Sequence, residues 1–242
     1  MGSCYAVTSG KGGTGKSTVS VGLAMAFAET GRKTLLIDMD IGLRCLDILL
    51  GVENRLVFDL GDILAGQDIG DAIYDTGFKD LFLIPAPANV GSIDPVAFKE
   101  FSRQITKKYD VVIFDFPAGM DFTLYGCLPK HTVALAVCNL DPVSVRDAAM
   151  VCENLPFPSA QSRLIVNKFH YKPMLKGVYG NIDSIIDRSG FMLLGVVPDS
   201  EELLYLSINN GLKKRGRPMA AFRRIVCRLC GMHRKLPAPK KI

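Results

Sequence analysis

The 242-residue sequence has no tryptophan, only three histidines and no acidic residue after Glu202. It also has no continuous apolar run of the roughly 18 to 20 residues that a membrane-spanning helix requires. Its beginning lacks the basic segment and long apolar stretch of a secretory signal. His131, His170 and His233 show no catalytic spacing to serine or cysteine, which argues against a nucleophilic triad. We therefore expect a protein that stays in the cytoplasm and spans no membrane.

The seven cysteines are odd in number and lack the spacing of a disulfide framework. This favours a reducing compartment, in which we expect most of them to be small core residues. Cys227 and Cys230 have the spacing of half a zinc site, but no second pair or histidine couple accompanies them. The sequence therefore favours no metal or redox role for that pair.

The charges are distributed unevenly along the chain. All 24 acidic residues lie at or before Glu202, whereas eleven of the 29 lysines and arginines follow it. The chain thus has a mildly acidic body and a strongly basic end. This asymmetry indicates a polyanionic partner for the basic end, either lipid headgroups or nucleic acid.

Short apolar runs rich in β-forming residues recur at residues 4–8, 34–37, 81–84, 111–114, 133–137, 164–166 and 192–197. Helix-like segments separate most of these runs. The alternation predicts an α/β fold, with a mostly parallel sheet, helices on both faces and ligand-binding loops at the carboxyl ends of the strands. No linker or composition break divides the chain, so we expect one domain over residues 1–231 and a short basic tail over residues 232–242.

A glycine-rich loop after the first strand is the strongest functional signal. Residues 10–18 satisfy the pattern G-x-x-x-x-G-K-[ST], and an amphipathic helix is predicted over residues 19–30. Glycines permit the torsions that aim backbone N–H groups at phosphate oxygens, and the helix adds the positive end of its dipole. We expect Lys16 to reach the β and γ phosphates of ATP and the Ser17 hydroxyl to ligate Mg²⁺. The nucleotide-binding residues expected here are Gly10, Lys11, Gly12, Gly13, Thr14, Gly15, Lys16, Ser17 and Thr18.

Lys11 is an additional lysine that phosphate binding within one chain does not need. With it, the loop resembles the deviant Walker A motif, K-G-G-x-G-K-[ST], of the MinD/ParA family of P-loop ATPases. The resemblance implies a P-loop NTPase fold of the SIMIBI type. It also implies a face-to-face dimer in which Lys11 acts on the partner's nucleotide. A lysine merely solvated on the loop is the alternative.

Two aspartates follow the second strand in a stretch that points to the MinD side of this family. Residues 38–47 read Asp-Met-Asp-Ile-Gly-Leu-Arg-Cys-Leu-Asp, similar to the family's D-x-D-I-G-L-R-N-L-D, with Cys45 where Asn is usual. The resemblance assigns to Asp40 the positioning of the attacking water, and to Asp38 a magnesium-shell or structural role. A helix cap or a turn is the alternative for both aspartates.

A third carboxylate ends the apolar strand over residues 111–114. Asp115 stands where a Walker B residue holds Mg²⁺ through a water, and residues 117–119, Pro-Ala-Gly, resemble the family's D-x-P-A-G switch. Asp121 lies where relatives carry glutamate, and its part in the switch is left open. The expected catalytic residues are Lys11, Lys16 and Asp40, and the expected metal-site residues are Ser17, Asp38 and Asp115.

Two later strand ends resemble the segments with which related ATPases contact adenine. Asn167 follows the strand over residues 164–166, and Pro198 follows the strand over residues 192–197. An asparagine side chain offers a donor and an acceptor to a purine edge. Asparagine also ends strands for reasons of turn geometry alone, so both explanations of Asn167 stay open.

Residues 219–230 form a basic helical pattern near the end of the chain. At 100° per residue, Arg223, Arg224 and Arg228 fall within an arc of about 140°. Such a helix could lie on anionic lipid. In the family, however, the last helix of the globular domain occupies this place and packs on the sheet, and we favour that role. The remaining tail is then too short and too rich in proline for a separate amphipathic helix.

The resemblance covers roughly residues 3–231 and implies an Mg²⁺-dependent ATPase switch in bacterial division-site placement. ATP favours the homodimer, slow hydrolysis resets it, and an activator speeds the reset. The expected partners are a second copy of the chain, inhibitor and activator proteins of the Min type, and anionic lipid at the inner face of the cell membrane. The alternative is a ParA-like or flagellar-number regulator whose basic end binds DNA or another polyanion. A metal-cluster carrier and a signal-transducing kinase fit the sequence poorly.

Overall fold

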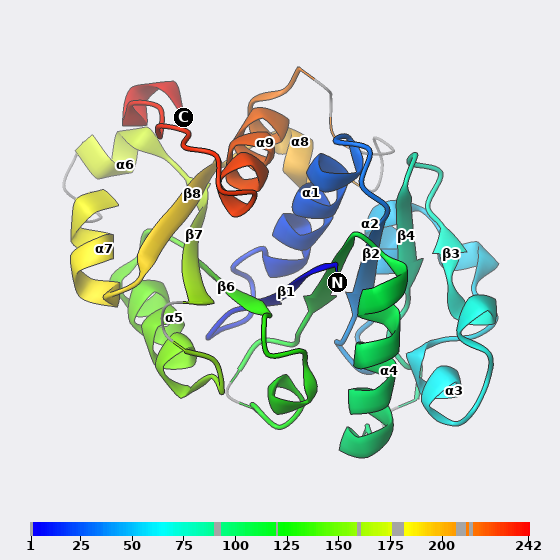
Figure 1. Ribbon diagram of the computed structural model, residues 1–242. Helices are drawn as coiled ribbons and strands as arrows, with labels where there is room; N and C mark the ends of the chain where they lie inside the picture. Colours follow the sequence, from blue (N-terminus) through cyan, green and yellow to red (C-terminus); the bar gives the residue numbers. More distant parts are fainter. Residues whose placement is uncertain are drawn as a thin grey trace.

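A computed structural model describes residues 2–89, 93–119, 121–158, 161–175, 182–206, 212 and 215–242. Its strands form one sheet of eight, in the order β3-β4-β2-β5-β1-β6-β7-β8, and helices lie on both faces (Figure 1). The strands are β1 (Ser3–Thr8), β2 (Thr34–Asp38), β3 (Tyr74–Asp75), β4 (Leu81–Ile84), β5 (Val111–Asp115), β6 (Val133–Cys138), β7 (Ser162–Phe169) and β8 (Met192–Pro198). All neighbouring pairs are parallel except β3 and β4.

Helices lie between most of these strands along the chain, as parallel pairing requires. The α-helices are α1 (Lys16–Ala28), α2 (Leu46–Leu50), α3 (Leu60–Leu64), α4 (Pro95–Lys108), α5 (Pro142–Asn154), α6 (Tyr171–Leu175), α7 (Ile182–Ser189), α8 (Glu201–Leu204) and α9 (Arg217–Leu229). Short 3₁₀ turns are η1 (Glu53–Arg55), η2 (Ile69–Ala72), η3 (Tyr125–Cys127) and η5 (Pro239–Lys241). The predicted α/β fold with a mostly parallel sheet is confirmed.

All seven predicted strands are present, but β3 was missed. It contains two residues and pairs antiparallel with β4 at the edge of the sheet, Tyr74 opposite Leu83 and Asp75 opposite Phe82. Two residues are too few to show an apolar period in the sequence. The edge strand therefore exists because of its neighbours and not because of a local preference.

Both faces of the sheet are buried, which explains why its strands read as continuous apolar runs. In β2, Leu36 packs in the core cluster that contains Phe27 of α1. Its neighbours Leu35 and Ile37 point to the opposite face and pack in the cluster that contains Phe98 of α4. Full burial of such a side chain stabilises the fold by about 1.5 to 3 kcal/mol.

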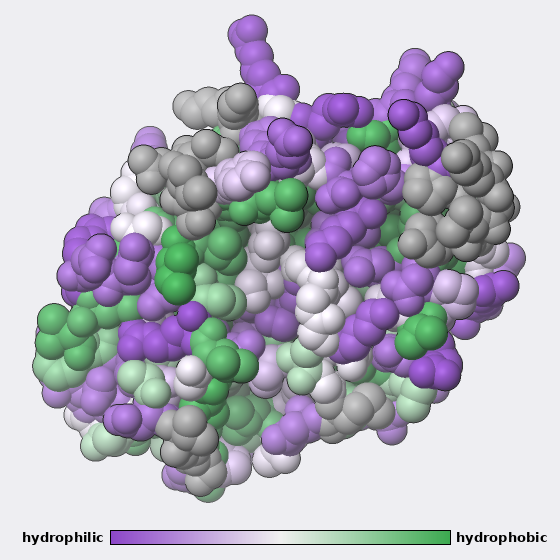
Figure 2. Space-filling view, turned by 180° about the vertical axis from the view of Figure 1, so that it is seen from behind, coloured by the Kyte–Doolittle hydropathy of each residue, from purple (hydrophilic) through white to green (hydrophobic). Residues whose placement is uncertain are grey.

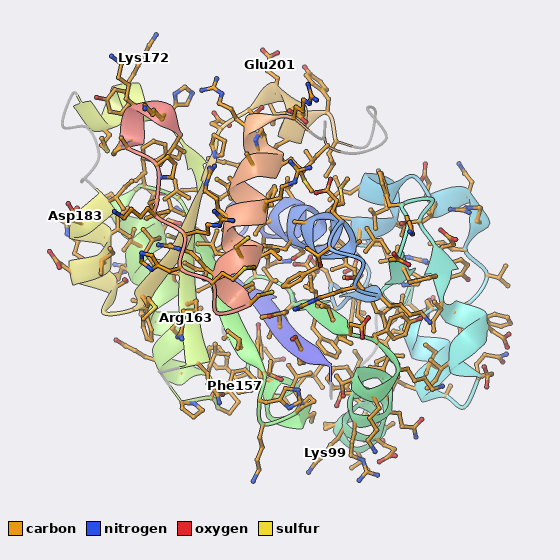
Figure 3. The ribbon with its side chains drawn as sticks, turned by 45° about the horizontal axis from the view of Figure 1, so that its top comes forward. Lys99, Phe157, Arg163, Lys172, Asp183 and Glu201 are labelled. Atoms are coloured by element: carbon orange, nitrogen blue, oxygen red, sulfur yellow. The ribbon has the colours of Figure 1, made fainter. Side chains whose placement is uncertain are left out.

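Helix α1 was predicted to be amphipathic, and this was wrong. Its side chains are buried almost all round because α9, from the other end of the chain, covers the face that the sheet does not (Figure 3). Gly22 makes this close approach possible, since a Cβ atom there would lie 2.2 Å from the ring of Phe222 in α9. A helix that is apolar all round is a buried helix.

The packing role that we favoured for residues 219–230 is the one observed. In α9, Phe222 and Ile225 are buried against α1 and β8. Arg223 of α9 donates from Nε to Oε2 of Glu29 at 2.7 Å, and Arg228 donates to the carbonyl of Leu194 at 2.6 Å. Two of the three arginines of the predicted basic arc are thus engaged within the chain.

The basic tail returns to the domain. Leu236 packs against the core cluster beside β8, and Ile242 is buried in it. The Nε of Arg228 donates to the carbonyl of Arg234 at 2.8 Å, which ties the tail to α9. The division into a domain over residues 1–231 and a tail over residues 232–242 stays a prediction.

We expected most of the seven cysteines to lie in the core, but fewer than half of them are fully buried. Cys4, Cys138 and Cys152 are buried, whereas four others, Cys45, Cys127, Cys227 and Cys230, are only partly buried. Within the described ranges, no group of three or more His, Cys, Asp or Glu residues is placed to hold a metal ion. All seven cysteines are free thiols, as expected, but their number and spacing did not predict which of them are buried.

Among the described residues, no helix combines the length and the apolar composition needed to cross a bilayer. The space-filling view shows hydrophobic residues in separate patches among hydrophilic ones on that face (Figure 2). Leu43, Val57, Val96 and Leu204 are among the large apolar side chains that are most exposed. They belong to different loops and helices.

Candidate functional site

The candidate site lies where three central strands end. β1 is paired with β5, and β5 with β2, so that Val7, Asp115 and Asp38 stand side by side across the sheet. The loops after these strands therefore converge at one edge. In parallel α/β sheets this carboxyl edge is where ligand-binding crevices form.

The glycine-rich loop wraps the N-terminus of α1. Gly13 and Gly15 adopt left-handed torsions, with φ of 77° and 83°, which favour glycine over other residues. A pocket of about 210 Å³ opens above the loop, lined by Ser9, residues 12–18, Asp40 and Ala118. Backbone N–H groups at the start of a helix suit an anion. The structure thus brings Asp40 to the same pocket as most of the predicted phosphate loop.

Lys16 and Asp115 form a buried ion pair under the loop. Lys16 Nζ lies 3.0 Å from Asp115 Oδ2 and 3.3 Å from Ser17 Oγ. The other carboxylate oxygen of Asp115 accepts from Ser20 Oγ at 2.7 Å. Lys16 is 7% exposed and Asp115 is fully buried, so removing either partner would leave the other charge buried without compensation. The oxygen donors of Ser17 and Asp115 are those that Mg²⁺ prefers.

Asp38 and Asp40 have different surroundings. The Asp38 carboxylate accepts the backbone N–H groups of Asp40, Cys45 and Leu46 at 2.9, 3.2 and 3.2 Å. Burial, together with the nearby Asp115 charge, raises the pKa of Asp38 to about 6. Partial burial also raises the pKa of Asp40, against the lowering effect of Lys16. Asp38 thus serves the backbone of its own loop, while Asp40 faces the pocket.

Lys11 points away from the pocket. Its Nζ lies 3.1 Å from Oδ1 of Asp141, the residue that caps α5 by accepting from the N–H of Ser144. The Ser144 N–H and the Lys11 ammonium outweigh burial and lower the pKa of Asp141. Gly10, next to Lys11, packs directly on α5, because a Cβ there would lie 2.5 Å from Cβ of Asp147. Lys11 and Gly10 therefore do not line the pocket.

Asn167 lies behind the loop and not over the pocket. Its Nδ2 donates to the carbonyl of Thr14 at 2.9 Å, and it would clash with a Cβ on Gly15 at 2.3 Å. The Oδ1 atom of Asn167 is buried without a partner. Lys168 follows with a left-handed φ of 51° and donates to the carbonyl of Gly13 at 2.7 Å. The end of β7 thus holds the loop from the outside.

Pro198 and Asp121 lie at the periphery. Pro198 is buried at the end of β8, in register with Phe169 of β7, and the strands β6 and β7 separate β8 from β1. Asp121 accepts the N–H of Thr123 at 3.0 Å, which lowers its pKa. Neither residue lines the pocket. Just before Asp121 in sequence, the Pro-Ala-Gly segment over residues 117–119 reaches the loop, since Gly119 N donates to the carbonyl of Ser9 at 3.1 Å.

The fold and this cradle define a nucleotide-binding protein of the P-loop class, and the comparisons agree. The CobQ/CobB/MinD/ParA nucleotide binding domain matches residues 5–211. The chain belongs to this family.

Within the family, the septum site-determining protein MinD is similar to nearly the whole chain. The Bacillus subtilis protein is 34% identical over 246 residues, which cover 96% of this chain and 90% of that protein. A chain of the MinC:MinD cell division protein complex of Aquifex aeolicus matches with a TM-score of 0.86 at 28% identity, over 98% of this chain and 99% of that one. MinD of Pyrococcus horikoshii, complexed with Mg-ADP, matches with a TM-score of 0.82 at 27% identity, over 96% and 98%. The resemblance predicted from the sequence is confirmed.

Several contacts of the site were not predicted. Ser20 donates a hydrogen bond to Asp115, Lys11 pairs with Asp141, and Lys168 donates to the carbonyl of Gly13. Lys168 directly follows Asn167, so its place beside the loop could have been expected from the predicted strand end. The pairing of Lys11 with Asp141 spans 130 positions and leaves no local signal in the sequence.

Proposed function

We propose that this chain is an Mg²⁺-dependent ATPase switch of the MinD type that acts in bacterial division-site placement. In this proposal ATP favours a face-to-face homodimer, and slow hydrolysis returns the monomer. The observation that carries it is the pocket in which the phosphate loop and Asp40 meet. The similarity to MinD proteins supports the same conclusion.

Each residue of the pocket has a separate task in this proposal. The loop N–H groups and Lys16 bind the phosphates, and Asp40 orients the attacking water in line with the γ phosphate. Ser17 and Asp115 are the residues that would hold Mg²⁺, whose chemistry is to neutralise charge that develops on the β and γ oxygens. The oxygen donors present fit this ion. The Pro-Ala-Gly segment, bonded to Ser9, would report the state of the γ phosphate.

For contact with the adenine base, we propose Asn167 and Pro198, as the family resemblance implies. The amide nitrogen of Asn167 is occupied by the loop, whereas its Oδ1 atom is buried and unpartnered. A free acceptor suits the exocyclic amino group of adenine. Pro198 would form the apolar side of the base pocket.

Lys11 is available to a partner at little cost. Its ion pair with Asp141 is partly exposed, at 38% and 30% of the two side chains, and exposed pairs contribute at most about 1 kcal/mol. Contact with a second chain's phosphates would replace this pair with a charge-assisted bond. Lys11 can therefore change from a partner within the chain to one in the other subunit.

Replacing Lys11 with alanine is expected to abolish ATP-dependent dimers while leaving the monomer folded. Light scattering after size-exclusion chromatography should be measured with ATP, with ADP and without nucleotide. The matched control is Lys99→Ala, which removes an exposed lysine on α4 that points away from the body of the protein (Figure 3). Dimers of unaltered strength in the Lys11 variant would remove this residue from its proposed role.

For partners, we propose inhibitor and activator proteins of the Min type, with the chain in the cytoplasm and in peripheral contact with the inner face of the cell membrane. The MinC:MinD complex of Aquifex aeolicus supports the first of these. The second candidate function, a ParA-like positioning ATPase that binds DNA, is favoured by the eleven basic residues after Glu202. ATP-dependent sedimentation with anionic vesicles would support the first function. ATP-dependent retention on DNA that falls steeply with salt would support the second.

A further inference from the structure

The loop between β2 and α2 carries Asp40 into the pocket. It makes a tight turn in which Leu43 N donates to the carbonyl of Asp40 at 3.2 Å, and Gly42 has a left-handed φ of 77°. Gly42 N also donates to the carbonyl of Pro87 at 3.1 Å. Leu43 itself is 75% exposed. The ends of such a loop must be anchored if its aspartate is to hold a water in one place.

Asp38 anchors both ends of this loop. Its carboxylate is 1% exposed, and it binds both ends of the loop, with Oδ1 at the N–H of Asp40 and Oδ2 at the N–H groups of Cys45 and Leu46. An ionised carboxylate has about four acceptor positions, and three are used here. Bonds from N–H groups to a charged acceptor are among the stronger hydrogen bonds in proteins.

We propose that Asp38 is a positioning residue for hydrolysis, which fixes the Asp40 loop through these three bonds, and that it is not a direct ligand of Mg²⁺. The proposal rests on the proposed ATPase function. It separates two aspartates that the sequence places together, because Asp38 acts through the backbone and Asp40 faces the reacting water. Asp115 and Ser17, bonded to Lys16 and Ser20, remain the residues for the metal.

The first test is an Mg²⁺ titration of the hydrolysis rate of Asp38→Asn in the full chain. The amide has one acceptor oxygen in place of two, so one end of the loop is released. A displacement of about 1 Å costs on the order of 100-fold in rate, and we expect kcat to fall by that factor. The half-saturating Mg²⁺ concentration should stay within about twofold of the parent, because no metal ligand is lost.

Two outcomes would overturn the proposal. One is a tenfold or larger rise in the half-saturating Mg²⁺ concentration, with kcat restored at saturation, which would place Asp38 in the metal shell. The other is an unchanged kcat. The matched control is Asp110→Asn, which removes a carboxylate that also accepts a backbone N–H, from Lys33 at 2.9 Å, in the turn that precedes β5. It should change neither quantity.

The second test does not use activity. The sequence contains no tryptophan, so Leu43→Trp places a single tryptophan, which can be excited apart from the tyrosines, on the exposed turn. Adding Asp38→Asn to this reporter should lower its fluorescence anisotropy and raise its quenching by acrylamide. An unchanged signal would mean that Asp38 does not hold the loop.

If Asp38→Asn fails to fold, hydrogen exchange on the parent chain tests whether Asp38 fixes the loop. The amides of Cys45 and Leu46 should be protected at least 100-fold over free peptide without nucleotide or Mg²⁺. Exchange at the free-peptide rate would overturn the proposal. If the chain hydrolyses no ATP at all, the ATPase proposal fails, while the fluorescence and exchange measurements still judge the role of Asp38.

Discussion

ATP affinity should fall by roughly 30- to 5,000-fold when Lys16 is replaced with alanine. Loss of one partner of a buried charge contact costs about 2 to 5 kcal/mol, and each 1.4 kcal/mol is a factor of ten. In this chain the ammonium group lies 3.0 Å from Asp115 and 3.3 Å from Ser17, beneath the loop that should hold the phosphates. Calorimetric titration with Mg-ATP measures the change directly.

The single Lys16 variant also leaves Asp115 fully buried without its countercharge, which costs stability. A double variant, Lys16→Ala with Asp115→Asn, removes that charge and should recover much of the thermal stability. It should still fail to bind the nucleotide. Normal binding by a folded Lys16 variant would contradict our placement of the phosphates.

Replacing Asp40 with alanine should slow hydrolysis but leave nucleotide binding intact, in contrast to Lys16→Ala. The variant should bind Mg-ATP and form ATP-dependent dimers, yet hydrolyse ATP roughly 10²- to 10³-fold more slowly, because only the positioning of the water is lost. Asp40 lines the pocket, and the described side chains give its carboxylate no hydrogen-bond or ion-pair partner whose loss would disturb the fold. Single-turnover phosphate release measures the rate. Hydrolysis at the parent rate would exclude Asp40 from this role.

The two variants together separate binding from chemistry. In the proposed site Lys16 contacts the bound phosphates in every state, so its loss should lower affinity first. Asp40 is proposed to act on the water, so its loss should lower kcat with little change in affinity. A variant of Asp40 that lost affinity as strongly as the Lys16 variant would mean that the carboxylate shapes the loop and not the reaction.

The phosphate loop could be predicted from sequence because its chemistry is local. Nine consecutive residues contain the glycine torsions, the lysine and the hydroxyl, and the positive φ angles of Gly13 and Gly15 follow from that local requirement. Asp38, Asp40 and Asp115 were also placed correctly at strand ends, since apolar strands that end in a carboxylate mark the carboxyl edge of a parallel sheet. The strands themselves followed from short apolar runs.

Contacts between distant segments could not be predicted in this way. Glu29 and Arg223 lie 194 positions apart and meet only because α9 crosses α1. The same crossing buries the face of α1 that the sequence presented as solvent-facing. The family resemblance made Asn167 a candidate for contact with the adenine base, with turn geometry as the alternative, but the position of its amide behind Thr14 depends on how β7 and the loop pack. Local patterns determine which groups are available, and packing determines which of them meet.

Main-chain amides and Lys16, at the opening turn of the chain, should hold one magnesium nucleotide. This binding can be measured by calorimetric titration of the full chain with a non-hydrolysable ATP analogue and Mg²⁺. We expect saturable binding of one nucleotide per chain. Titration without measurable heat, confirmed by the absence of nucleotide-dependent protection of residues 12–18 from hydrogen exchange, would contradict the account.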